Sequence, residues 1–157
     1  CVTCDDTKPH DHTFWEKLKS GVAYAYVEFL DDISDCFLSR DVGPWRYRII
    51  LPFSIITRDG PVVLATEEAV EENFNNYVSA CETMSLSMIS RRALSLEDCA
   101  DGTWLGTYET RLLANGLLAT NPYTSTALLS RKDNVVRMSS ILNGRGHHEW
   151  TGLEIEI

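Results

Sequence analysis

The residues with the most reactive side chains lie near the two ends of the chain. Near the start, Cys1, Cys4, His10 and His12 offer two thiols and two imidazoles. Such a set can bind Zn²⁺ tetrahedrally, but the gap between the two pairs is too short for the common finger spacings and no second half-site follows. The polar composition of residues 1–12 predicts a flexible tail instead. The sequence therefore predicts no metal site.

The other two histidines, His147 and His148, precede Glu149 and Trp150 in a segment that begins with flexible, glycine-rich composition. Imidazoles titrate near neutral pH, so this segment could cover the mouth of a pocket. The alternative, which we favour, is a flexible C-terminal extension over residues 144–157. The chain contains no glycine-rich phosphate loop, nucleophile elbow or HExxH motif.

Tyr108 and Glu109 are candidates for acid–base chemistry because they are neighbours in a predicted strand and must point to opposite faces. A buried Glu109 would have a raised pKa and could act as a base. The alternative, which we favour, places Glu109 on the outer face in a ladder with Arg91, Arg111 or Arg137.

Trp45, Tyr47 and Arg48 lie on a short predicted helix. Tyr47 could donate a hydrogen bond to a carbonyl and Arg48 could hold an acid; the favoured alternative makes Trp45 and Tyr47 core aromatics and pairs Arg48 with a surface carboxylate. Further along, Asn121-Pro122-Tyr123 interrupts a predicted strand. This break is either a bulge that directs a side chain into a pocket or a kink that protects a sheet edge.

Helical patterns predict the elements that position these residues. Thr13 and Glu16 form a capping box, and an apolar stripe continues from Phe14 to Phe37. The stripe predicts one helix to about residue 39 or two pieces broken near Gly21. Asp41 predicts the cap of a short helix that ends at about residue 50, before Leu51-Pro52. Thr66 predicts the cap of a third helix.

Strands account for most of the remaining chain. Two short strands are predicted at 53–57 and 61–65. A four-stranded meander follows, at 85–96, 103–113, 117–130 and 134–143, with Asp101-Gly102 and Asn115-Gly116 at two of its turns. We expect one α+β domain over residues 13–143, in which the helices cover one face of the sheet.

Composition excludes several classes of partner. The formal net charge is −9, which argues against nucleic acid and against anionic membranes, since both require clustered basic residues. No apolar run is long enough to span a membrane. Five scattered cysteines do not resemble a disulfide framework, which favours a reduced, cytoplasmic protein.

The order helix, short helix, two strands, helix and meander resembles the NTF2-like superfamily, including SnoaL-like domains. Leu51-Pro52-Phe53 leading into Ile55-Ile56-Thr57-Arg58-Asp59-Gly60 carries the resemblance, as does the last strand ending in Ser140-Ile141-Leu142-Asn143. The resemblance implies a curved, mixed sheet wrapped around three helices as a cone. It also implies an apolar pocket for a small apolar or aromatic molecule and a homodimer through the sheet's outer face, with no cofactor. The candidate ligand-binding residues are Trp45, Tyr47, Arg48, Tyr123 and Asn143.

Members that resemble ketosteroid isomerase, scytalone dehydratase or polyketide cyclases are enzymes with an Asp or His base inside the cone. Here the first strand, 53–57, has no carboxylate; Asp59 lies in the turn, and all four histidines lie near the ends. We therefore expect a binding module without assignable catalysis. The alternative is a lyase or isomerase in which Tyr47, Tyr108 or Tyr123 meets Glu109 or Asp59. A third possibility, the small subunit of an oxygenase, requires a second kind of chain on the sheet.

Overall fold

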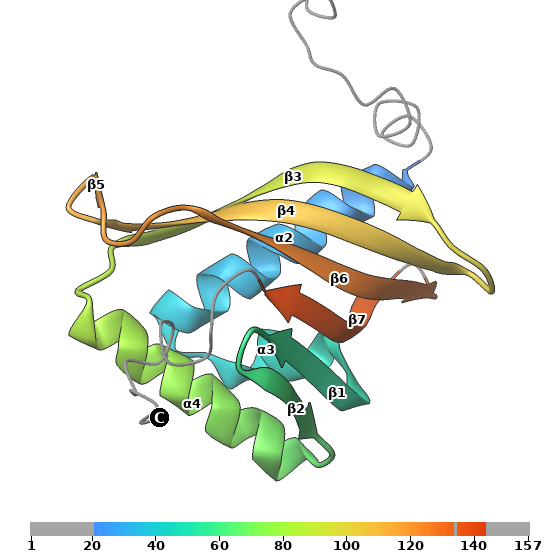
Figure 1. Cartoon of the computed structure of the whole chain (residues 1–157), viewed down its shortest axis with the longest axis horizontal. Coiled ribbons are helices and arrows are strands. Elements are labelled where there is room, and N and C mark those ends of the chain that lie inside the picture. Colours follow the sequence, from blue (N-terminus) through green and yellow to red (C-terminus); the bar gives the residue numbers. More distant parts are fainter. Residues whose placement is uncertain (1–20, 134, 144–157) are drawn as a thin grey trace, which may run out of the picture.

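The computed structural model describes residues 21–133 and 135–143. In this part of the chain, three helices pack on a seven-stranded sheet (Figure 1). The helices are α2 (Val22–Ser39), α3 (Val42–Tyr47) and α4 (Glu67–Thr83); the strands are β1 (Ile49–Thr57), β2 (Gly60–Leu64), β3 (Met88–Asp98), β4 (Thr103–Ala114), β5 (Leu117–Leu118), β6 (Tyr123–Lys132) and β7 (Val135–Asn143). The strand order is β2-β1-β7-β6-β4-β3, and the short β5 pairs with β4.

The predicted meander is confirmed: β3, β4, β6 and β7 pair in antiparallel fashion. Its turns have the expected chemistry, because Asp101-Gly102 and Asn115-Gly116 adopt positive φ at both positions. The third strand, predicted over 117–130 with an interruption at 121–123, divides there into β5 and β6. The sheet is mixed because β1 pairs with β7 in parallel.

The predicted end of the second helix was wrong. The helix stops at Tyr47, and the chain enters β1 at Ile49, before Pro52 rather than after it. Pro52 is tolerated inside β1 because the β1–β7 register is irregular between Ile49 and Ser54 and β2 begins to pair only at Phe53. No ladder hydrogen bond is therefore required from the position of this proline.

Two predicted helix caps are confirmed. The Asp41 side chain accepts a hydrogen bond from the Gly43 amide at 3.0 Å, and the Thr66 hydroxyl accepts one from the Ala69 amide at 3.1 Å. Gly21 lies just outside α2 with φ 86°, a conformation that favours glycine. The predicted helical residues before it, including Thr13 and Glu16, lie outside the described residues.

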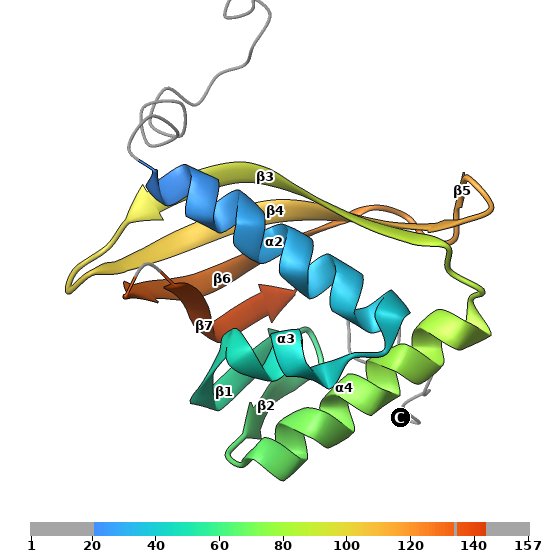
Figure 2. The same cartoon turned by 180° about the vertical axis from the view of Figure 1, so that it is seen from behind.

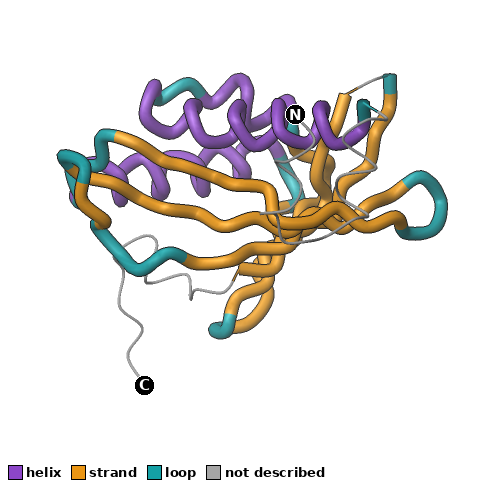
Figure 3. Tube along the Cα trace, turned by 90° about the horizontal axis from the view of Figure 1, so that it is seen from above, coloured by secondary structure: helices purple, strands orange, loops and turns teal. Residues whose placement is uncertain are grey.

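The helices all lie on one side of the sheet, as Figures 2 and 3 show. The apolar stripe of α2 packs against the inner sheet face, with Tyr26, Phe29 and Ile33 fully buried. Gly106 on β4 permits close approach, since a Cβ there would lie 2.7 Å from the Tyr26 ring. The Tyr26 hydroxyl donates to the Thr107 carbonyl at 2.9 Å, which fixes α2 on the sheet.

Candidate functional site

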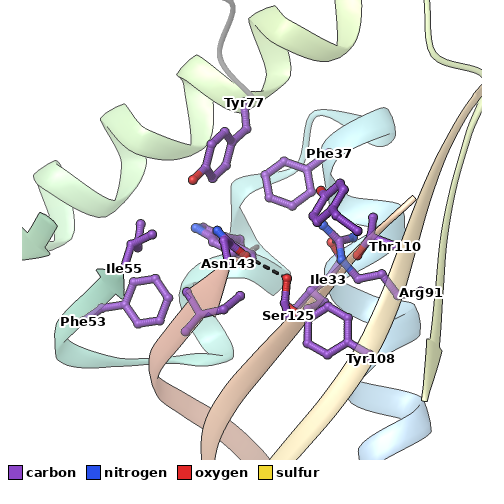
Figure 4. Close-up of a pocket in the computed structure, with 13 residues that line it drawn as sticks. Ile33, Phe37, Phe53, Ile55, Tyr77, Arg91, Tyr108, Thr110, Ser125 and Asn143 are labelled. Carbon is purple, nitrogen blue, oxygen red and sulfur yellow. Dashed lines mark hydrogen bonds between the residues drawn. The ribbon is translucent and has the colours of Figure 1, made fainter. Parts of the chain in front are cut away.

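A small cavity lies between the inner sheet face and the helices (Figure 4). Its aromatic side includes Phe37 from α2, Trp45 from α3 and Tyr77 from α4. The rings of Phe37 and Trp45 are 4.9 Å apart between centroids, so two helices contribute to one aromatic wall. The cavity volume is about 20 Å³, which is room for roughly one water molecule.

The sheet supplies the polar side of the cavity, because alternate residues of β4, β6 and β7 point inward. Tyr108 and Thr110 come from β4, Ser125 from β6 and Asn143 from the end of β7. Register places Ser125 opposite both Tyr108 and Asn143. The Ser125 hydroxyl donates to Asn143 Oδ1 at 2.8 Å, as Figure 4 shows.

Arg91 on β3 is the cavity's cationic residue. Its Nη1 donates to the Ile33 carbonyl at 3.0 Å and contacts the Ser34 hydroxyl at 3.2 Å, so α2 holds the guanidinium group in place. The group also lies 5.7 Å from the centroid of the Phe37 ring. Among the described lining residues none is an aspartate, glutamate or histidine, so the charge of Arg91 has no carboxylate counterpart there.

Burial controls the ionisation of the cavity's phenols. It raises the pKa of Tyr108, and the charge of Arg91 and hydrogen bonding to Ser125 only partly oppose the rise. It also raises the pKa of Tyr77. Both hydroxyls are therefore protonated at neutral pH and can donate hydrogen bonds to a ligand. Neither can act as a base.

Several buried polar atoms around the cavity lack a hydrogen-bond partner. They include Trp45 Nε1, Arg91 Nε and Thr110 Oγ1, which belong to three of the residues that line it. Buried polar groups in native proteins are almost always paired, so each of these three atoms can still form a hydrogen bond with a species in the cavity. The cavity is therefore lined with hydrogen-bonding capacity that the described protein residues do not use.

Comparison with known proteins identifies the fold. No family model matches the sequence, and no curated protein matches it. Among solved structures, Aln2 from a Streptomyces species is 18% identical with a TM-score of 0.60, over 82% of this chain and 91% of that chain. An NTF2-like protein of unknown function from Shewanella oneidensis is 10% identical with a TM-score of 0.58, over 76% and 96%. LinA is 15% identical with a TM-score of 0.55, over 81% and 88%.

The fold is NTF2-like. The predicted superfamily layout and the α+β cone are thereby confirmed, and the cavity lies in the interior of the cone. At these identities the likeness shows the fold alone. The chemistry of this NTF2-like chain has to be read from its own residues.

Three of the five predicted ligand-binding residues line the cavity: Trp45, Tyr123 and Asn143. The break between β5 and β6 ends at Tyr123, which places this side chain in the cone; Asn121 is exposed. Arg91, Tyr123 and Asn143 are only half-buried, whereas the other lining residues are buried, so these three mark the entrance.

Tyr47 and Arg48 are not among the residues that line this cavity. Tyr47 is 52% exposed and stacks under Arg137 at 4.7 Å. Arg48 is buried and donates to Asp32 Oδ2 from Nε at 3.1 Å and from Nη2 at 2.6 Å, while Nη1 donates to the Val136 carbonyl at 3.0 Å. Arg48 therefore braces α2 against β7, in agreement with the alternative that paired it with a carboxylate. That alternative was wrong for Tyr47, which it made a core aromatic and which is exposed.

Of the neighbours Tyr108 and Glu109, only Tyr108 points into the cone. Glu109 lies on the outer face and contacts Arg111 at 3.0 Å and Arg92 at 3.4 Å. Hydrogen bonding from Arg111 lowers the pKa of Glu109 despite partial desolvation, which is the opposite of what a buried base requires. The favoured ladder is thus present, although its β3 member is Arg92 and not Arg91. Asp59 lies in the β1–β2 turn and does not line the cavity either.

The four residues considered as zinc ligands and not favoured, Cys1, Cys4, His10 and His12, lie outside the described residues, as do His147 and His148. Among residues 21–133 and 135–143 no cluster of three or more histidine, cysteine, aspartate or glutamate side chains could hold a metal ion. In the same part of the chain no helix is both long and apolar enough to cross a membrane.

The sequence analysis missed Arg91, Thr110 and Ser125 as cavity residues. The signal for Arg91 was its spacing of two from Ile89, a buried residue on the inner face of β3. Thr110 likewise follows the buried Tyr108 by two residues. A residue two positions from a buried residue in the same strand lies on the same face of the sheet. This spacing therefore indicates an interior position for a charged residue that hydropathy alone does not reveal.

Proposed function

We propose that this chain is a small-molecule-binding NTF2-like domain of the SnoaL-like kind, which takes an apolar or aromatic ligand in the interior of the cone. One observation carries the proposal: aromatic side chains and unused hydrogen-bond donors line the same cavity. This combination is typical of ligand pockets, where apolar walls supply contact area and a few polar groups fix the orientation. The cysteines are scattered through the sequence, and the three described ones, Cys36, Cys81 and Cys99, are free thiols, which further favours a cytoplasmic setting.

A ligand larger than water requires the cavity to widen, because its volume is only about 20 Å³. The half-buried residues at the entrance, Tyr123 and Asn143, are the side chains that can move with the least loss of packing. We therefore expect binding to rotate the entrance side chains while the buried wall of Phe37 and Trp45 stays in place.

The lyase or isomerase alternative gains no support from the placement of its residues. It needed a tyrosine together with Glu109 or Asp59 inside the cone, and neither carboxylate lies there. Tyr108 could stabilise an oxyanion as a neutral donor, but a proton-transfer step also requires a base. Binding is the function that the described residues can perform.

Native mass spectrometry of freshly purified protein tests this proposal. We expect one small molecule with an apolar or aromatic skeleton per chain, and we expect Ser125→Leu to displace it because Ser125 is buried at the cavity. Thr124→Leu is the matched control, since Thr124 is the adjacent, exposed residue on the outer face. Protein that releases no compound and gains no thermal stability from a panel of apolar and aromatic compounds would contradict the proposal.

We also propose a homodimer through the outer sheet face. Two rows of residues cross the sheet there in register: Pro61, Ile56, Leu142, Thr126, Thr107 and Ser95 form one, and Val63, Ser54, Ser140, Leu128, Leu105 and Glu97 form the other. Only Glu97 among these is charged, and Leu142 is 53% exposed. These two rows have one charged residue and about half aliphatic side chains, a composition that suits a two-fold contact with a second copy.

Sedimentation analysis tests the dimer directly. We expect the protein to sediment as a dimer and Leu142→Glu to sediment as a monomer, because the substitution would bury two like charges at the interface. A monomeric wild-type chain would contradict the proposal. A requirement for a second kind of chain would instead favour an oxygenase-type small subunit.

A further inference from the structure

We propose that the pocket binds an organic carboxylate with a flat, conjugated body, and that Arg91 holds the carboxylate group. This inference rests on the proposed function, because it assigns a chemical class to the ligand of the same pocket. It concerns Arg91 and two buried neighbours, Thr110 and Trp45, which have hydrogen-bonding atoms without a partner.

The orientation of Arg91 supports bidentate recognition. Nη1 is engaged by α2 through Ile33 and Ser34, whereas Nε is buried and has no hydrogen-bond partner. The Arg91 side chain also hydrogen-bonds the Tyr108 hydroxyl, so α2 and β4 hold the guanidinium group in place while Nε stays available on the edge that carries Nε and Nη2. Two parallel donors on this edge match the two oxygens of a carboxylate.

The polar atoms of the cavity that have no hydrogen-bond partner favour a ligand with hydrogen-bond acceptors. Arg91 Nε and Trp45 Nε1 can only donate hydrogen bonds, and the Thr110 hydroxyl can donate as well. Thr110 is 1% exposed and Trp45 is 4% exposed, so bulk solvent does not satisfy them. A ligand that brings several acceptor lone pairs would pair groups that are otherwise buried without partners.

Charge balance favours an anion over a neutral acceptor. Arg91 carries the single formal charge among the described residues that line the cavity. A water molecule can accept two hydrogen bonds but leaves that charge uncompensated. A carboxylate accepts up to four and also neutralises the charge.

The aromatic side chains that line the cavity favour a ligand whose carboxylate is attached to a flat, conjugated body. Phe37 lies against the Arg91 guanidinium, and Trp45 and Tyr77 continue the aromatic surface. A ring or conjugated chain attached to the carboxylate would stack on these side chains. The expected ligand class is therefore an aromatic or conjugated monocarboxylate.

Calorimetric titration of the full chain with paired probes tests the inference. The acids are benzoate, trans-cinnamate and 1-naphthoate, and their neutral partners are benzamide, cinnamamide and 1-naphthamide. We expect at least one acid to bind at one site per chain and its amide to bind about tenfold more weakly or worse, since a hydrogen bond to a charged group contributes that much or more.

Three arginine variants distinguish binding in the pocket from a general effect of charge. Arg91→Gln should abolish the preference for the acid. Arg92→Gln removes a cation from the adjacent position but on the outer face, where Arg92 contacts Glu109, and should keep the preference. Arg91→Lys retains the charge without the paired donors and should restore only part of the preference.

Thr110→Val provides a test that keeps α2 anchored. It removes a hydroxyl group that has no hydrogen-bond partner, so the fold should be retained while affinity for the acid falls. Acids that bind no tighter than their amides, or a preference that survives Arg91→Gln, would overturn the inference. Failure of all three acids to bind at millimolar concentration would overturn it too. A neutral compound released from the purified protein at one per chain would then leave the proposed function standing.

Discussion

The structure predicts that Asp32→Asn destabilises the protein although Asp32 is partly exposed. Asp32 is the carboxylate partner of Arg48, whose side chain is 8% exposed, against 44% for Asp32. The substitution is nearly isosteric and removes the negative charge. It leaves the Arg48 cation buried without a negative charge beside it, next to neutral groups such as the Val136 carbonyl.

The expected loss of stability follows from the exposed fractions of the Arg48 and Asp32 side chains. Breaking a fully buried ion pair costs about 3–5 kcal/mol because an uncompensated charge remains. Breaking an exposed pair costs about 0–1 kcal/mol. Since solvent reaches Asp32 but hardly reaches Arg48, we expect a loss of about 2 kcal/mol in the free energy of unfolding, or about 4–8 °C in Tm for a chain of this size.

Urea denaturation followed by circular dichroism measures this difference. Asp31→Asn is the matched control, because it makes the same change at the preceding, exposed position of α2 and cancels effects of helix propensity and net charge. The reasoning fails if the two variants unfold within about 0.5 kcal/mol of one another, the usual range for surface substitutions. It also fails if Asp32→Asn changes ligand affinity with no change in stability, since Arg48 would then belong to the site.

Further predictions concern packing, thiol reactivity and pH. Gly106→Ala should cost about 1–3 kcal/mol in denaturation experiments by forcing its methyl group against the Tyr26 ring, and a cost near zero would show that the ring can move away. Burial raises the pKa of the Cys36 thiol to about 12. Iodoacetamide at pH 8 should therefore label the exposed Cys99 and leave Cys36 unmodified until the protein unfolds. Peptide mapping that finds Cys36 labelled in the folded protein would contradict this prediction. The pKa of Glu109 is lower in the folded protein than in the unfolded chain, where it is about 4.3. The ion pairs of Glu109 therefore stabilise the fold at pH values above the unfolded pKa, and this stabilisation is lost as the pH falls through the folded pKa. Glu109→Gln should therefore lower Tm slightly at pH 7 and not at about pH 2, and an equal loss at both would refute the assignment.

The fold was predictable because local signals agreed with the tertiary structure. Asp41 and Thr66 cap helices whose apolar stripes face the sheet, and the Asp-Gly and Asn-Gly pairs form the expected turns. The break before Tyr123 was visible in the sequence. Whether the break directs the Tyr123 side chain into the cone depends on how β6 pairs with β4. These features are set by residues close together in the chain.

The site was less predictable because side-chain direction depends on element boundaries. The sequence pattern predicted that the short helix continues to about residue 50. The helix ends at Tyr47 instead, and Arg48 points toward Asp32 and not into the cone. Arg91 was placed in an outer ladder because arginine is usually exposed. Only the pairing of β3 with β4 and the contact with α2 establish that Arg91 faces inward.

The most direct test of ligand binding in the cone is to follow the tryptophan indole signals by ¹H–¹⁵N NMR during titration with trans-cinnamate. Trp45 of α3 lines the cavity, whereas Trp104 of β4 does not, so Trp104 serves as an internal reference. The chain has four tryptophans, so Trp45→Phe identifies the Trp45 signal and Trp104→Phe identifies the Trp104 signal. Binding in the cone predicts a saturable shift of the Trp45 indole and an unchanged Trp104 indole. A Trp45 signal that stays fixed while cinnamate saturates the protein would place the ligand elsewhere and contradict the account.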